Sequence, residues 1–182
     1  MANSGTEVFA LLRDIETRSR QKALGLPQQL EIRHTETGIG FLLQDMALVV
    51  ATSEISEILP YPPLTRIPGT LNWMRGVANI RGTLVPIIDL LGFAKQETTR
   101  LNRKSRILVM HRGDLVSGLL VTEVLGLRHF FEEEKTTDLP PASARLQGLL
   151  DGGYQQGDQH WGIFSTRRLA DMPEFINVAA EV

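Results

Sequence analysis

Two arginine–glycine pairs, Arg75-Gly76 and Arg81-Gly82, stand six positions apart in an otherwise apolar stretch between residues 67 and 90. Arginine is costly to bury, and its planar guanidinium group offers five N–H donors in a fixed fork. Such groups on either side of an apolar strand are suited to binding a carboxylate or the polar edge of another protein. The spacing therefore predicts a contact surface rather than a catalytic site.

Asp89 is the one acidic residue of this stretch and lies near the end of the apolar run 84–90. It can orient Arg75 or Arg81 through a bidentate ion pair, and we favour this interpretation over a catalytic acid. Catalysis would need a second carboxylate, a serine with a histidine, or a Gly-x-Ser-x-Gly turn, and the surrounding sequence has none of these. The four histidines match no short metal motif. We therefore predict no catalytic residue, no metal and no cofactor.

The composition is that of an ordinary soluble protein, with 42% hydrophobic and 22% charged residues over 182 positions. A net charge of −2 gives no general attraction to nucleic acid or to an anionic membrane, and the short basic segments 100–106 and 167–168 lack interleaved aromatic residues. The sequence has no cysteine, no long apolar run and no basic-then-apolar leader. We therefore predict a cytoplasmic protein that binds no nucleic acid and does not insert directly into a membrane.

The elements that must position the arginines are mostly short β-strands. Turn-forming residues at 44–45, 81–83 and 112–114 separate many of them, which is the rhythm of a mainly β protein with hairpins. The charged stretch 94–105 divides the strands into two blocks. The predicted strands are the apolar runs 39–43, 47–51, 55–59, 77–80, 84–90, 106–110, 115–121 and 161–164.

Helices are predicted at the two ends of the sequence. Apolar residues recur at helical spacing over residues 6–26, and this helix either packs on its own domain, which we favour, or binds a partner. A second short helix is predicted over residues 166–176, with Thr166 as its cap and Pro173 inside it. Pro86 constrains the strand at 84–90, because proline cannot donate to a ladder. The strand should therefore be an edge strand, or Pro86 should lie where its missing N–H has no partner.

The arginine stretch resembles the signature of the CheW family, the adaptors that couple chemoreceptors to a histidine kinase. Flanking segments at 49–61, 107–110 and 117–124, and a turn at 122–125, resemble the rest of that family's sequence, so the resemblance covers residues 38–169. The motif itself is specific in its double Arg-Gly and its Pro-Ile-Ile-Asp-Leu. Its parts are Ile67-Pro-Gly, Met74-Arg-Gly-Val-Ala-Asn-Ile-Arg-Gly and Leu84-Val-Pro-Ile-Ile-Asp-Leu.

The resemblance implies a fold of two small five-stranded SH3-like β-barrels side by side. The domain would span residues 36–178, with two intertwined barrels at roughly 36–95 and 104–165 followed by the helix at 166–176, and residues 1–35 would be a helical extension and linker. In this family the signalling tip of a methyl-accepting receptor docks at a groove between the barrels. The first barrel pairs with the regulatory domain of a CheA-type histidine kinase.

Alignment on the motif assigns Arg81 as the central polar contact with the receptor. Arg81 can also tie its loop to Asp89, and the two roles are compatible. Gly76 can permit close approach of the partner, or it can kink its strand. Gly82, Pro86 and Asp89 would be structural residues of the motif. The implied receptor-binding set is Ile55, Glu57, Arg75, Gly76, Asn79 and Arg81.

The extension before the first strand resembles a branch of the family that serves type IV pili and twitching motility. Residues 6–21 would then be a contact specific to that branch. A flagellar chemotaxis coupling protein is the alternative within the family. A small β-barrel that binds nucleic acid is the alternative outside it, and the acidic net charge and scarcity of aromatic residues argue against it.

Overall fold

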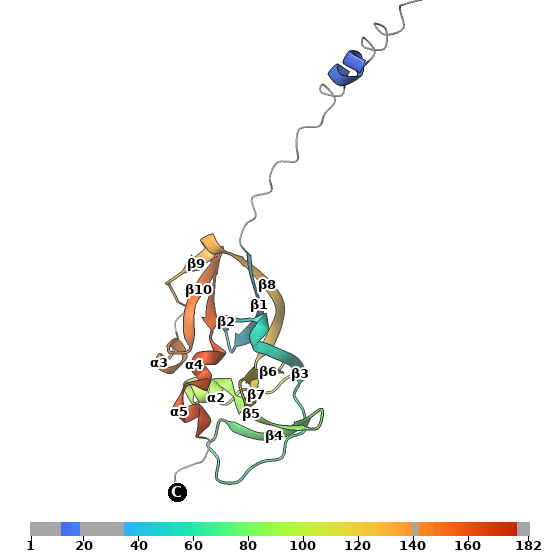
Figure 1. Ribbon diagram of the computed structural model, residues 1–182. Helices are drawn as coiled ribbons and strands as arrows, with labels where there is room; N and C mark the ends of the chain where they lie inside the picture. The colour runs from blue at the N-terminus through green and yellow to red at the C-terminus, as the bar shows by residue number, and fades with distance from the viewer. Residues whose placement is uncertain (1–11, 19–34, 140–141, 178–182) are drawn as a thin grey trace, which may run out of the picture. The chain divides into compact units, whose positions relative to one another are not determined.

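The computed structural model describes residues 12–18, 35–139 and 142–177 (Figure 1). The chain divides into two units, Met1–Arg33 and His34–Val182. In the first unit residues 12–18 are helical, with an ion pair between Asp14 and Arg18 one turn apart. The helix predicted over 6–26 is therefore present at 12–18, and the remainder of that prediction lies outside the described residues.

The second unit contains two β-sheets, as predicted for a mainly β protein. The first sheet has six strands in the order β8 (Glu123–Phe131), β1 (Thr35–Leu43), β2 (Met46–Ala51), β11 (Gln159–Phe164), β10 (Leu150–Gln156) and β9 (Lys135–Thr136). The second has five strands in the order β3 (Ile55–Pro60), β6 (Arg106–Arg112), β7 (Leu115–Val121), β5 (Thr83–Asp89) and β4 (Met74–Ile80). Neighbouring strands are antiparallel, except that β2 is parallel to β11 and β5 is parallel to β7.

Neither sheet is formed from one continuous stretch of the chain. Each sheet takes strands from both blocks: β1 and β2 join β8 to β11, whereas β3, β4 and β5 join β6 and β7. The first sheet also has six strands where five were predicted. The apolar runs identify strands but do not specify which strands pair, so this strand order does not follow from the runs alone.

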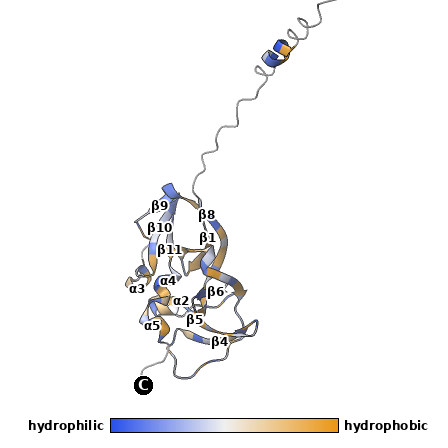
Figure 2. Cartoon of the chain, viewed as in Figure 1, coloured by the Kyte–Doolittle hydropathy of each residue, from blue (hydrophilic) through white to orange (hydrophobic). Residues whose placement is uncertain are grey.

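The strands near the middle of the sheets are rich in hydrophobic residues (Figure 2), and their two faces lie against different cores. In β2, Leu48 and Val50 belong to the large core that also takes residues of the second sheet, whereas Ala47 and Val49 pack with Trp161 in a core of the first sheet. The same alternation occurs in β5, β6 and β7, whose other faces form a third core. Burial on both faces explains why these strands are continuous hydrophobic runs.

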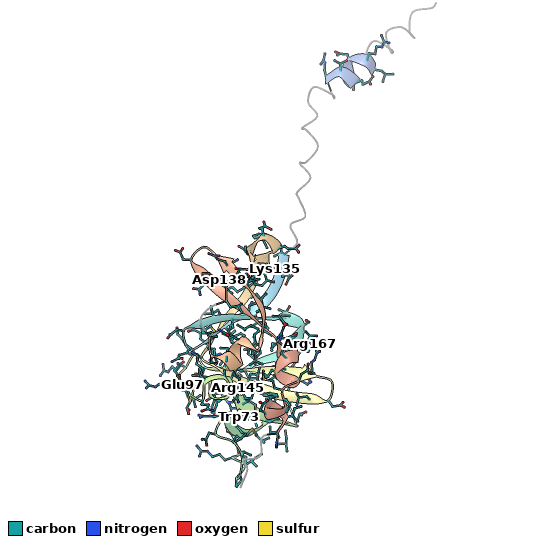
Figure 3. All side chains as sticks on the ribbon, turned by 90° about the vertical axis from the view of Figure 1, so that its left-hand side faces the viewer. Trp73, Glu97, Lys135, Asp138, Arg145 and Arg167 are labelled. Atoms are coloured by element: carbon teal, nitrogen blue, oxygen red, sulfur yellow. The ribbon has the colours of Figure 1, made fainter. Side chains whose placement is uncertain are left out.

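Helices α2 (Leu90–Lys95), α3 (Ala144–Gln147), α4 (Thr166–Ala170) and α5 (Pro173–Ile176) lie together on one side of this unit (Figure 1). Single 3-10 turns, η1 (Thr52–Glu54) and η2 (Glu132–Glu134), follow β2 and β8. Trp73 and Arg145, both labelled in Figure 3, contact the ring of Phe93, and Phe175 of α5 stacks on Trp73. No helix among the described residues has the length and hydropathy that crossing a membrane requires.

The helix predicted over 166–176 is two short helices. Ser165, not Thr166, caps α4 by accepting a hydrogen bond from the backbone N–H of Arg168. Thr166 instead donates its hydroxyl to Glu54, at 2.8 Å. Pro173 has no N–H to continue a helix but fits the first turn of a new one, and it begins α5.

Three strands, β8, β9 and β10, were missed by the sequence patterns, and one predicted turn is wrong. Residues 123–125, assigned to a turn at 122–125, begin the nine-residue strand β8. The strand β10 contains Gly152-Gly153, which resembles turn chemistry. A Cβ at position 153 would lie 2.7 Å from the carbonyl oxygen of Trp161, so the close approach of β11 requires a glycine there.

Candidate protein-interaction site

Arg81 lies at the tip of the hairpin between β4 and β5. Arg81 and Gly82 both have positive φ angles, 52° and 87°, which is the requirement of a tight two-residue hairpin turn. The Asn79 side chain accepts a hydrogen bond from the backbone N–H of Gly82 at 2.8 Å, which fixes the turn. The Arg81 side chain is 81% exposed as a result.

The partner of Arg81 is Glu57 on β3. The Arg81 guanidinium donates to the Glu57 carboxylate at 2.7 Å. Because β3 and β4 are the two edges of the second sheet, this ion pair joins the hairpin at one edge to the strand at the other. The alternative in which Arg81 ties its loop to Asp89 is therefore wrong.

Asp89 is a buried structural residue at the end of β5. Its carboxylate lies 3.8 Å from the Arg75 guanidinium, so of the two arginines considered it is Arg75 that pairs with Asp89, by an ion pair rather than a bidentate hydrogen bond. Three other groups donate to Asp89: the backbone N–H of Gly92, and the backbone N–H and hydroxyl of Thr99. These bonds cap α2 and fix the segment that follows it.

Gly76 is approached closely by its own chain. It has a φ of 137° and lies at a register shift in the β4–β5 ladder. Thr65 pairs with Val77 through two backbone hydrogen bonds of 2.9 and 2.8 Å, and a Cβ at position 76 would lie 2.5 Å from the Thr65 carbonyl oxygen. The Thr65 segment of the same chain is therefore what approaches Gly76 closely, and Gly76 also lies where the pairing of β4 with β5 is irregular.

Pro86 lies in an interior strand, because β5 runs between β7 and β4. The pairing of β5 with β7 begins only at Ile87, and the Pro86 carbonyl accepts a hydrogen bond from the Ser117 hydroxyl on β7. The N–H and C=O of an extended residue point to the same side, so the position of the missing N–H of Pro86 also faces β7. There it precedes the first residue of β5 that pairs with β7. No ladder hydrogen bond is lost to the proline.

The residues predicted for receptor binding fall into two groups. Glu57, Asn79 and Arg81 meet at the hairpin, and Ile55, at the start of β3, packs partly into the large core. Arg75 and Gly76 lie at the other end of β4, beside Asp89 and Thr65. Arg75 and Arg81 are six positions apart, which is about 20 Å of extended chain at 3.3 Å per residue.

Sequence reasoning missed Thr99 and Arg66. Thr99 lies ten positions beyond Asp89, a spacing that belongs to no recognised motif. Arg66 lines a hollow beside Arg75, in the loop between β3 and β4. The signal for this loop was its three prolines, Pro62, Pro63 and Pro68, which indicate a rigid segment around an arginine.

Residues 37–174 match the CheW-like domain family, so the chain belongs to the CheW-like family. It is 40% identical over 171 residues to Protein PilI of Pseudomonas aeruginosa, which covers 94% of this chain and 96% of PilI. It is 26% identical over 164 residues to Chemotaxis protein CheW of Helicobacter pylori, with 88% and 94% of the two chains covered. The resemblance inferred from the motifs, including that to the pilus-associated branch, is confirmed.

The fold is similar to the crystal structure of the scaffolding protein TtCheW from Thermoanaerobacter tengcongensis. The TM-score is 0.66 with 20% sequence identity, and the match covers 81% of this chain and 97% of TtCheW. The similarity shows that the two sheets are arranged as in a CheW scaffold.

Proposed function

We propose that this chain is a non-enzymatic adaptor that couples a methyl-accepting chemoreceptor to a CheA-type histidine kinase, in a system that controls type IV pili and twitching motility. Membership of the CheW-like family supports the adaptor role. The 40% identity with PilI, against 26% with the Helicobacter pylori CheW, favours the pilus system over flagellar chemotaxis.

The observation that carries the proposal is the presentation of Arg81. Its guanidinium is exposed at a hairpin tip yet held in one direction by Glu57, with Asn79 fixing the turn beneath it. An ion pair this exposed adds only about 0–1 kcal/mol to stability, so stability alone is a weak reason for it. An oriented arginine that keeps further donors is instead suited to anchor a partner.

Apolar side chains on the same strands support a docking role. Leu84 of β5 is 72% exposed and Ile58 of β3 is 41% exposed. Protein interfaces typically combine such apolar area with a few arginine anchors. We therefore assign Arg81, Glu57 and Asn79 to a partner contact, with Ile55 positioning the start of β3.

An adaptor of this kind needs no bond chemistry. It holds two partners in a defined geometry, and its effect on the kinase is limited to the difference between its contacts in the active and inactive states. To couple a receptor to a kinase, such a domain needs one surface for each of these two partners.

The test is a calorimetric titration of the full chain with the regulatory domain of a CheA-type kinase from the same organism, and separately with a receptor signalling tip. Arg81→Glu should weaken receptor docking by more than about 1 kcal/mol, the threshold of an anchor residue. Arg103→Glu, a charge reversal in an exposed turn away from the hairpin, is the matched control.

The double variant Arg81→Glu/Glu57→Arg separates the two roles of the ion pair. It restores the internal pair with reversed charges. Docking that stays weak in the double variant supports direct contact between Arg81 and the receptor, whereas restored docking shows that the pair acts by shaping the hairpin. Normal docking of Arg81→Glu contradicts the residue assignment, and wild type that binds neither partner contradicts the proposed function.

A further inference from the structure

Glu54 joins the connection between the two sheets to the start of α4. It is the last residue of η1, the turn that follows β2 of the first sheet and precedes β3 of the second. One oxygen of its carboxylate accepts both the backbone N–H of Thr166, at 3.2 Å, and the Thr166 hydroxyl, at 2.8 Å. Thr166 begins α4 directly after β11 of the first sheet. The contact therefore fixes the point at which the chain passes from one sheet to the other.

The rest of η1 has weaker side-chain contacts. Ala51, which precedes the turn, has no polar side chain to cap it, and both Thr52 and Ser53 are exposed. The Thr52 hydroxyl lies 3.5 Å from the carbonyl oxygen of Thr37, which is long for a hydrogen bond between two oxygens. The carboxylate of Glu54 is half-buried, and hydrogen bonds to a charged acceptor are stronger than neutral ones. Glu54 therefore makes the firmest side-chain contact of the turn.

The residues that follow Glu54 set the direction of the Glu57 side chain. The register of β3 against β6 shifts between Ile55 and Glu57, which leaves Ser56 as an extra residue in β3. A bulge of this kind bends its strand and redirects the side chains beside it. The Ser56 hydroxyl donates to the Val109 carbonyl at 3.1 Å, which attaches the bulge to β6. The position of Glu57 therefore depends on where Glu54 holds the start of the strand.

We propose that Glu54 is a positioning residue for the receptor contact at Arg81. Its bonds to Thr166 hold the start of β3, and the start of β3 directs the Glu57 carboxylate that orients the Arg81 guanidinium. Glu54 acts through Glu57 and does not touch the receptor itself. This inference rests on the proposed function, because that proposal assigns Arg81 to receptor docking.

The test is a calorimetric titration of the full chain and its variants with a receptor signalling tip. Glu54→Ala should weaken docking by about three- to tenfold, the range typical of residues that act indirectly. Glu54→Gln keeps an acceptor oxygen and should lose less. Thr166→Val removes the hydroxyl that donates to Glu54 and should also weaken docking, so the test does not depend on Glu54→Ala being folded.

Ser165→Ala is the matched control for the stability of α4. It removes the N-cap of the same helix but leaves the bonds between Glu54 and Thr166 in place. Its melting temperature should fall, and it should bind the receptor tip as wild type. Loss of docking in Ser165→Ala equal to that in Glu54→Ala would show that the stability of α4, rather than the position of β3, controls docking.

A double-mutant cycle with Arg81→Ala separates positioning from general destabilisation. Where the Arg81 guanidinium is already absent, Glu54→Ala should weaken docking no further, because Glu54 acts only through that group. A full additional loss in the double variant, or equal binding of Glu54→Ala and wild type, overturns the inference and leaves the adaptor role standing. A wild-type chain that does not bind the receptor tip overturns the receptor part of the proposed function and this inference with it.

Discussion

The carboxylate of Asp89 receives both the backbone N–H and the hydroxyl of Thr99, at 2.9 and 2.6 Å. The same carboxylate accepts the backbone N–H of Gly92, in the first turn of α2, and so caps this helix. One buried side chain therefore joins the end of β5, the start of α2 and the segment after that helix. We therefore expect Asp89 to support the fold rather than to contact a partner.

Replacing Asp89 should therefore destabilise the fold. Asp89→Ala removes a helix cap and leaves buried donors of Thr99 without their acceptor, so we expect the free energy of unfolding to fall by about 2–3 kcal/mol. Urea denaturation measures this change. Asp45→Ala, at an exposed turn, should alter the free energy of unfolding by less than about 0.5 kcal/mol. Equal stabilities of the two variants would contradict the role of Asp89.

Gly76→Ala should cost more stability than Gly82→Ala. Both glycines have positive φ, so both variants carry backbone strain. At position 76 the new methyl group also meets the Thr65 carbonyl oxygen at 2.5 Å, whereas at position 82 nothing lies within 4 Å. We expect a difference of at least about 1 kcal/mol in the free energy of unfolding, measured by urea titration. A smaller loss at 76 than at 82 would show that the Thr65 segment moves aside freely.

The ion pair of Arg81 and Glu57 should matter little for stability. The arginine is 81% exposed, and solvent screens pairs of this kind. A double-mutant cycle with Arg81→Ala and Glu57→Ala should give a coupling free energy below about 1 kcal/mol in thermal or urea unfolding. A coupling of several kcal/mol would mean that the pair closes the sheet, and the docking interpretation of Arg81 would lose its main support.

Stability should fall at alkaline pH because of Tyr154. Its hydroxyl donates to Glu36 at 2.5 Å, and burial, together with this bond, raises the pKa of Tyr154 above its usual range. The stability that comes from the neutral phenol is complete below the unfolded pKa of about 10 and is lost as the pH rises beyond it.

The measurement is the free energy of unfolding in urea at several pH values between about 8 and 11. Tyr154→Phe should flatten the decline of the wild type above pH about 10. Tyr61→Phe controls for the loss of a phenol elsewhere in the chain. If Tyr154→Phe and wild type decline in parallel, the phenol of Tyr154 is not the group responsible.

The strands that could be predicted from the sequence are those in which burial of the side chains produces a continuous run of hydrophobic residues. The central residues of β2, β5 and β6 are buried on both faces, so these runs are largely apolar. β8 was missed because Gly126 lies at an irregularity opposite β1 and Leu127 is 60% exposed, which removes the expected alternation. The parallel pairing of β2 with β11 had no local signal at all.

The sequence identified residues of the candidate site but did not show which of them form ion pairs with one another. The motif identified Arg75, Arg81 and Asp89, and the structure brings Asp89 to Arg75 alone. Glu57 reaches Arg81 only because β3 and β4 are opposite edges of one sheet. Such a contact depends on how the sheet curves, and a residue's neighbours along the chain do not encode it.

The parallel pairing of β2 with β11 also determines when the protein can fold. Leu48 pairs with Gly162, 114 positions further along the chain. At a synthesis rate of roughly 5–20 residues per second, Leu48 is synthesised about 6–23 s before this partner. The first sheet is therefore completed only after almost the whole domain has been translated, and until then one edge of the apolar strand β2 lacks its native partner and is open to pairing with other chains.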